Sequence, residues 1–131
     1  MTYGNSDAML CYWELECNNA PFAYVEYLAV RQELRCKGIG TKVMAEFLAL
    51  MKNVPVLLEV ELPVCHQTKK RVAFYERLGL TLLPDYYMQP SYGVVPGLEM
   101  KLMVAFPNGE CMTTVADMAK VVQQEVYLKK I

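Results

Sequence analysis

Apolar residues recur along the first half of this chain with two different periods. Residues 9–17 and 22–30 are short, mostly apolar runs joined by turn-forming residues, which predicts two antiparallel strands. From Ile39 to Met51 the apolar residues return at every fourth position, which is the spacing of one helix face. Pro55 follows and ends this run. The pattern therefore predicts two strands and then an amphipathic helix.

The second half of the chain repeats this alternation. Residues 57–62 form an apolar run bounded by prolines, which predicts a mostly buried strand. Thr68 suits the N-cap of a helix over residues 69–78, and Gly79 suits the position after its C-terminus. A hairpin is expected next, with strands at residues 81–88 and 98–104 and a loop at residues 90–97. A turn at residues 107–109 and a final helix at residues 114–128 complete the expected elements.

Between the second strand and the first helix lies the segment RCKGIGT, residues 35–41, in which two glycines are flanked by cations. A helix N-terminus leaves about four backbone N–H groups without intrahelical partners and carries a partial positive charge. Gly38 and Gly40 lack the Cβ atoms that would keep an anion away, and Arg35 and Lys37 add positive charge. The segment therefore predicts a phosphate-binding loop.

Two well-known phosphate loops fit this segment poorly. A Walker-type loop needs a further glycine five positions before its final Gly-Lys pair, and this chain has none. A dinucleotide-binding loop is a closer alternative, because Glu59 follows about twenty residues downstream. Against it, Val43 replaces the third glycine, and seven residues separate Val30 from Gly38 where that fold has a tight turn.

Four segments of the chain, in order, resemble the Gcn5-related N-acetyltransferase (GNAT) superfamily. RCKGIG is similar to its motif A, Gln/Arg-x-x-Gly-x-Gly/Ala. YVEYLAV and VLLEVELP resemble the strands on either side of that motif, the fourth and fifth of the family. AFYERLGL resembles motif B, in which a helix carries a tyrosine and stops at a glycine. The resemblance covers roughly residues 8–104.

The resemblance implies an α/β fold of the α+β kind. It has a mixed, twisted sheet whose strands splay at the cofactor cleft, helices on both faces, and here an extra C-terminal helix. Residues 1–104 would form the core, and residues 105–131 a turn and a helix packed on the same domain. The family usually has a strand, two helices and another strand before the segment that begins near residue 8. Its N-terminal first third, which forms much of the acceptor wall, is therefore expected to be missing.

The resemblance also implies that acetyl-CoA is the co-substrate. Leu28, Ala29 and Val30 would present backbone groups to its pantetheine arm. Thr68 stands where many relatives have an asparagine that touches the cofactor, seven residues before the motif B tyrosine. The residues implied to hold the pyrophosphate are Arg35, Cys36, Lys37, Gly38, Ile39, Gly40 and Thr41.

The implied reaction is transfer of an acetyl group to an amine by direct attack on the thioester. An alkylammonium must first lose a proton, which a carboxylate can take through water. Glu26 is the leading candidate because it has the strand parity of Leu28, and Glu59 and Glu61 are rivals across the splay. Tyr75 occupies the position of the motif B tyrosine, which in the family serves as the proton donor to the leaving thiolate.

Composition narrows the range of partners. A chain of 131 residues with a net charge of −1 predicts one domain without the basic field that a nucleic acid backbone requires. Five cysteines without a Cys-x-x-Cys pair, beside a single histidine, make a structural zinc or a disulfide framework unexpected. The chain lacks a recognisable leader and any apolar run of about eighteen residues, so no membrane contact and a cytoplasmic location are expected.

The sequence leaves the acceptor amine unidentified and admits an alternative function. The missing first third and the extra helix favour a non-catalytic CoA-binding or protein-interaction module of the same fold. A truncated sheet would also expose an edge strand at residues 9–17, through which a homodimer could form.

Overall fold

The computed structural model describes residues 1–35, 37–52, 54–89, 98–105 and 115–127. The predicted loop 90–97, the predicted turn 107–109 and Cys36 lie outside the described residues. No helix in the described part of the chain is both long enough and apolar enough to cross a membrane.

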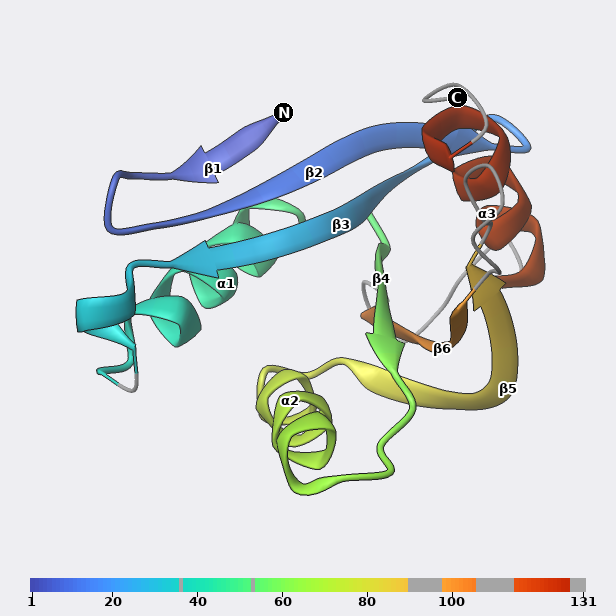
Figure 1. Cartoon of the computed structure of the whole chain (residues 1–131). Coiled ribbons are helices and arrows are strands. Elements are labelled where there is room, and N and C mark those ends of the chain that lie inside the picture. Colours follow the sequence, from blue (N-terminus) through green and yellow to red (C-terminus); the bar gives the residue numbers. More distant parts are fainter. Residues whose placement is uncertain (36, 53, 90–97, 106–114, 128–131) are drawn as a thin grey trace.

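Within the described residues, six strands form one mixed sheet in the order β1-β2-β3-β4-β6-β5 (Figure 1). Among the described strands, only β3 and β4 pair in parallel. The strands are Thr2–Gly4 (β1), Ala8–Cys17 (β2), Ala20–Val30 (β3), Val56–Glu61 (β4), Thr81–Gln89 (β5) and Leu98–Ala105 (β6). The helical elements are the 3₁₀ turn Gln32–Leu34 (η1), the helices Ile39–Leu50 (α1), His66–Arg77 (α2) and Val115–Val122 (α3), and the π turn Gln123–Tyr127 (η3). The mixed α/β fold expected from the sequence is confirmed.

Two elements were not predicted, and the first of them corrects an expectation. Strand β1 pairs with the first part of β2, from Thr2↔Cys11 to Gly4↔Met9. The beginning of β2 is therefore not the exposed edge that the sequence suggested. The second, η1, occupies part of the long connection between β3 and α1. Both are only three residues long, which is too short for a hydrophobic period to be recognised.

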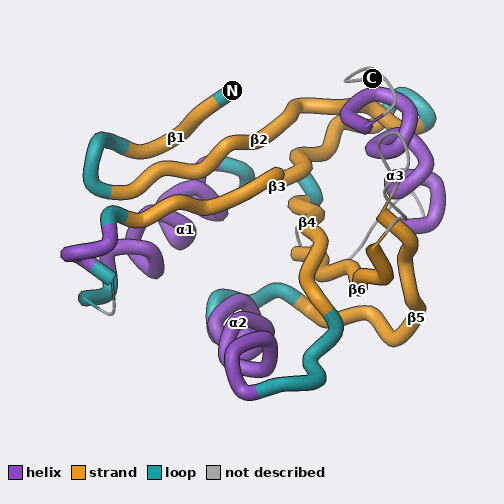
Figure 2. Tube along the Cα trace, in the orientation of Figure 1, coloured by secondary structure: helices purple, strands orange, loops and turns teal. Residues whose placement is uncertain are grey.

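Two apolar cores lie on opposite faces of the sheet. Helices α1 and α2 cover one face, where Phe47 is fully buried and its ring lies 4.8 Å from that of Tyr12. Helix α3 covers the other face, where Met118 and Val122 pack with Tyr24 of β3. Figure 2 shows α3 on its own, away from α1 and α2. The arrangement places helices on both faces, as the apolar stripes of the helices predict.

Strands β3 and β4 stay together over a short distance only. They pair at three positions, from Ala23↔Val56 to Val25↔Leu58. Beyond that point β3 continues along β2 as far as Val30, and β4 continues along β6 as far as Glu61. The two strands therefore diverge, as the ribbon in Figure 1 shows, and the facing backbone groups of β3 lose their β4 partners. We call this divergence the fork.

A β-bulge lies at the fork. Cys11 pairs with Tyr27, but the next residue, Tyr12, pairs with Val25, so Glu26 is an extra residue in β3. A bulge shifts the alternation of side chains along a strand by one position. As a result, Leu28 packs on the α1–α2 face together with Val25.

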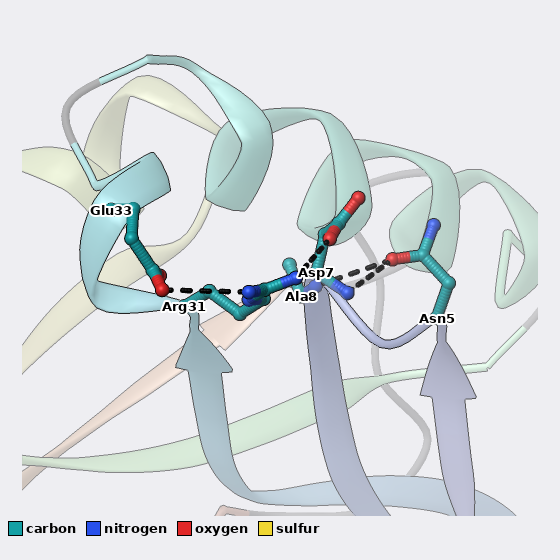
Figure 3. A network of polar contacts seen from close by, with 5 residues as sticks. All are labelled: Asn5, Asp7, Ala8, Arg31 and Glu33. Atoms are coloured by element: carbon teal, nitrogen blue, oxygen red, sulfur yellow. Dashed lines mark hydrogen bonds and ion pairs between the residues drawn. The ribbon is translucent and has the colours of Figure 1, made fainter.

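The junction between β3 and the following loop is tied to the β1–β2 turn (Figure 3). The Asn5 side-chain oxygen accepts the backbone N–H groups of Asp7 and Ala8, at 2.9 and 3.3 Å. The Arg31 backbone N–H donates to the Asp7 carbonyl at 2.8 Å, and its guanidinium lies 3.4 Å from both Asp7 and Glu33. Exposed ion pairs contribute little on their own, so the backbone bond is the firmer tie.

The N-terminus of α2 differs from the expectation. Cys65, not Thr68, is the N-cap, and the Thr68 hydroxyl at the third helical position accepts the Cys65 backbone N–H at 3.1 Å. The exposed Cys65 sulfur lies 3.5 Å from the same hydroxyl. The hydrogen bond from Thr68, helped by the Thr68 and Gln67 backbone amides, lowers the pKa of the Cys65 thiol below its ordinary value.

Replacing Thr68 by valine should therefore make Cys65 react only at higher pH. Thr68→Val removes the hydroxyl that stabilises the thiolate, so the midpoint of alkylation by iodoacetamide moves to higher pH. Mass spectrometry of the Cys65 peptide measures this midpoint. Thr81→Val, at an exposed strand position, is the control, and equal midpoints in the two variants would contradict the assignment.

Candidate active site

A cavity of about 490 Å³ lies between the end of β3, the start of α1 and helix α2. Its described lining residues are Leu28, Val30, Leu34, Arg35, Gly38, Gly40, Thr41, Lys70, Ala73, Phe74 and Arg77. Strand, loop and helix thus converge on one hollow directly beside the fork. Concave sites of this kind, with apolar walls and a few polar groups, are the usual form of a small-molecule site.

The structure brings together six of the residues that the sequence assigned to acetyl-CoA. They are Leu28, Val30, Arg35, Gly38, Gly40 and Thr41. The remaining described residues of that set do not line the cavity. Ala29 is exposed, Lys37 is exposed at the loop, Ile39 packs toward the α1–α2 core, and Thr68 is buried in the cap of α2. Alternation along β3 explains Ala29, because it lies between two residues that face the cavity.

The glycine loop is shaped as an anion site requires. Gly38 is the N-cap of α1 and has a left-handed conformation, with φ 80° and ψ 2°. Its carbonyl accepts the first helical bond, from the Lys42 N–H at 3.0 Å. The N–H groups of the first turn have no carbonyl partner within a helix, and this turn borders the cavity at Gly40 and Thr41. The loop therefore presents backbone donors and a positive helix end to the cavity.

Gly40 allows α1 to approach the strand closely. A Cβ atom at this position would lie 3.2 Å from the Val30 Cγ2 atom, 3.7 Å from the Leu28 Cδ2 atom and 3.9 Å from the Phe74 Cζ atom. The first of these distances is closer than ordinary van der Waals contact. Since all three neighbours line the cavity, a side chain at residue 40 would press on its wall.

Helix α2 supplies residues that the sequence reasoning missed. Lys70, Ala73, Phe74 and Arg77 follow one another at the three- and four-residue spacing of one helix face, and all line the cavity. The sequence shows that these residues share one helix face, but that face indicates a site only once the helix is known to lie opposite the glycine loop. With Arg35, these residues give the described lining three cations and no carboxylate. The cavity therefore favours an anionic ligand.

Tyr75 lies next to this face of α2 but is not among the described lining residues. It packs against the α1–α2 core, and its ring meets that of Phe74 edge-on, with centroids 5.1 Å apart. Burial raises the pKa of the Tyr75 phenol above its ordinary value of 10.0, against a smaller opposing effect of Arg71. The hydroxyl is therefore a proton donor throughout the neutral range.

The candidate carboxylates differ in their surroundings. Trp13 Nε1 donates to Glu26 Oε2 at 3.0 Å, and the Tyr24 hydroxyl donates to Glu59 Oε1 at 2.5 Å. Both glutamates are half-buried, whereas Glu61 is exposed and lies 3.4 Å from Arg71. The two half-buried carboxylates at the fork are therefore better placed than Glu61 to meet a ligand.

The parity argument for Glu26 is wrong. Because of the bulge, Glu26 does not share a face with Leu28, which packs with the α1–α2 core. Glu26 instead meets the side chain of Trp13, which packs against the core on the α3 side. An inserted residue cannot be recognised from the alternation of a single strand, since it depends on how the neighbouring strand pairs.

Comparisons with known proteins agree with this geometry. The family model described as "Acetyltransferase (GNAT) family" matches residues 8–80. A solved GNAT-family acetyltransferase structure, named as such from Bacteroides thetaiotaomicron, superposes with a TM-score of 0.81 and 31% identity, over 95% of this chain and 70% of that one. The NatC complex bound to Gag peptide and CoA shares the fold, with a TM-score of 0.58 and 17% identity over 76% of this chain and 60% of that one.

A curated relative is similar over a shorter stretch. The Bacillus subtilis (strain 168) protein YjbC, whose name describes it as an acetyltransferase, is 44% identical over 59 residues. These residues are 43% of this chain and 29% of the relative, so the match spans less than a third of that protein. The family match also excludes the dinucleotide-binding alternative, because the glycine loop belongs to the matched segment. This chain belongs to the acetyltransferase (GNAT) family.

Proposed function

We propose that this protein transfers an acetyl group from acetyl-CoA to an amine. The observation that carries the proposal is the cavity beside the fork, where a glycine-capped helix N-terminus and three cations face one another. CoA carries several phosphate charges at one end and a thioester at the other. The cationic, glycine-lined part of the cavity would hold the phosphates, and the edge of β3 beside it would hold the arm that carries the thioester.

The proposed binding mode follows from the open edge of β3. Beyond Val25, β3 no longer pairs with β4, and the backbone of Leu28, Ala29 and Val30 would bond to the amides of a pantetheine arm. Leu28 and Val30 would line this arm through their side chains. Backbone N–H groups of the same edge would stabilise the oxyanion that develops on the thioester carbonyl.

In the proposed reaction, the neutral amine nitrogen attacks the thioester carbonyl carbon. A C–N bond forms, the C–S bond breaks, and the CoA sulfur leaves as a thiolate that takes up a proton. Glu26 is the proposed base that removes the proton from the incoming ammonium, with Glu59 as its rival. Tyr75 is the proposed donor to the thiolate, and its raised pKa keeps it protonated for that role.

A non-catalytic CoA-binding module is the second candidate. The position of Tyr75 favours it, because this residue is not among the described residues that line the cavity. The two candidates differ in turnover and not in affinity. A calorimetric titration with acetyl-CoA, followed by an amine screen that detects free CoA thiol, separates them.

Filling the space above Gly40 should weaken CoA binding. Gly40→Val would crowd Val30 and Phe74, two residues that line the cavity, and would leave less room for the ligand, so the affinity is expected to fall about fivefold or more. Calorimetry measures the Kd. Ala45→Val, at an exposed position of the same helix, should bind CoA as the parent does. A parental Kd for Gly40→Val would argue against CoA in this cavity.

Removing a cation of α2 should weaken CoA binding in a salt-dependent way. Arg77→Gln and Lys70→Gln are each expected to raise the Kd about threefold to thirtyfold at low salt, with a smaller effect at high salt because exposed charges are screened. Lys69→Gln is the matched control, since Lys69 is exposed on the same helix but is not a lining residue. Equal Kd values for all three variants would remove α2 from the binding site.

Tyr75→Phe should separate turnover from binding. Loss of the phenol is expected to lower kcat at least tenfold and to leave the Kd for CoA unchanged. Because burial raises the pKa of this phenol, the parent protein should show no alkaline loss of kcat from this group below about pH 9. Tyr3→Phe, which removes a hydroxyl that bonds to Glu46, is the control. Unchanged kcat in Tyr75→Phe would exclude it as the proton donor.

A further inference from the structure

The η1 turn carries one wall of the proposed CoA cavity, yet it buries little apolar surface. Leu34, its last residue, and Arg35, which follows it, both line the cavity. Leu34 is only half-buried, and the other residues of η1 and Arg35 are exposed. Burial of apolar area is the main force that fixes a segment in a fold, so it holds this segment weakly. The position of η1 therefore depends on the hydrogen bonds at the point where it leaves the sheet.

That point is Arg31, the N-cap of η1. Its carbonyl accepts the Leu34 N–H at 2.9 Å, which closes the turn. Its own N–H donates to the Asp7 carbonyl at 2.8 Å. Ala8↔Val30 is the outermost pair between β2 and β3, so the bond to Asp7 extends their ladder by one residue. The start of η1 is thereby joined to the segment that precedes β2.

Asn5 shapes the β1–β2 turn and with it the direction of the Asp7 carbonyl (Figure 3). The Asn5 side-chain oxygen accepts the N–H groups of Asp7 and Ala8, and the Asn5 backbone N–H donates to the Ala8 carbonyl at 2.9 Å. Gly4, before it, has a φ of 120°, and a Cβ atom there would overlap the Ala8 carbonyl. An asparagine that bonds to the backbone two residues further on stabilises a tight turn. One side chain therefore fixes how Asp7 meets the Arg31 N–H.

Side chains bridge the same two segments. The Arg31 guanidinium lies 3.4 Å from the carboxylate of Asp7 on the turn and 3.4 Å from that of Glu33 on η1. Figure 3 shows Arg31 between these two carboxylates. The ion pairs are exposed to solvent, so they are screened and contribute little. The backbone bond from Arg31 to Asp7 is therefore the stronger link between the turn and η1.

We propose that Asn5 is a positioning residue for CoA, which acts through the Asp7 carbonyl and the Arg31 N–H to hold η1 and Arg35 at the phosphate end of the cavity. The inference rests on the proposed function. It adds that this end of the site depends on a turn to which none of the described lining residues belongs. Arg35 has a long side chain, and anchoring its backbone lowers the ordering cost of bringing its charge to a phosphate.

Arg31→Pro removes the N–H donor of this link. Arg31 has a φ of −55°, which proline can adopt, and the preceding Val30 lies in a strand, as the residue before a proline prefers. Arg31→Gln is the matched control, because it loses the same guanidinium but keeps the N–H. We expect Arg31→Pro to have a Kd for CoA at least about fivefold higher than that of Arg31→Gln, measured by calorimetry. Equal Kd values in these two variants would overturn the proposal.

A double-mutant cycle tests whether the effect passes through Arg35. Asn5→Ala removes the acceptor that shapes the turn, and it should raise the Kd for CoA about fivefold or more in the parent protein and in Lys70→Gln, because Lys70 lies on α2. In Arg35→Gln the same change should alter the Kd by less than about twofold, since the charge that the turn positions is already lost. A general loss of structure would weaken binding by the same factor in all three backgrounds, and that result would overturn the proposal.

Two further variants separate positioning from stability. Asn5→Asp keeps the acceptor oxygen and should keep the Kd for CoA within about twofold of the parental value. Asn18→Ala replaces an exposed residue with a φ of 52° in the β2–β3 turn, at the other end of the hairpin, and should lower the Tm without changing the Kd. If Asn18→Ala weakened CoA binding as much as Asn5→Ala at a similar loss of Tm, the positioning role would be wrong.

The parent protein decides separately whether the proposed function stands. Absence of CoA binding in the parent would overturn the proposed function, and the positioning role with it. CoA binding in the parent, together with the parental Kd in both Asn5→Ala and Arg31→Pro, would overturn the positioning role alone.

Discussion

The short pairing between β3 and β4 is the constraint on which the rest of the structure depends. Each strand keeps its outer partner to its end, β3 along β2 and β4 along β6, but the two keep each other for three positions only. The sheet therefore divides along an internal edge, where β3 and β4 no longer pair with each other. Backbone groups at such an edge need a partner, and a ligand with amides of its own can supply it. The cavity, the glycine loop and α2 are all arranged around this edge.

The bulge at Glu26 decides which side chains of β3 lie on each face of the sheet at this edge. A regular strand would direct Glu26 to the same side as Leu28, and the carboxylate would then lie among the apolar walls of the cavity. The extra residue sends the carboxylate to Trp13 on the α3 side and returns Leu28 to the α1–α2 side. One inserted residue thus places the Glu26 carboxylate and the Leu28 cavity wall on opposite faces of the sheet.

The proposed anion site takes its groups from three elements that packing holds in place. Gly40 brings α1 against Val30 and Leu28, the Arg31 backbone bond ties the end of β3 to the β1–β2 turn, and the cap at Cys65 starts α2. Because these elements are anchored in one core, the cations Arg35, Lys70 and Arg77 are brought around one cavity before a ligand arrives. Such preorganisation reduces the ordering cost of binding.

The sequence by itself determined the local features of this protein. Hydrophobic periods located α1 and the longer strands, the glycines at 38 and 40 located the loop that begins α1, and both follow from short-range rules of helix and turn geometry. Only the tertiary structure decided which elements face one another. It brought Lys70 and Arg77 to the cavity and turned Glu26 to the opposite face. Each of these depends on contacts between residues far apart in the chain or on the pairing of a second strand, which no period within one segment records.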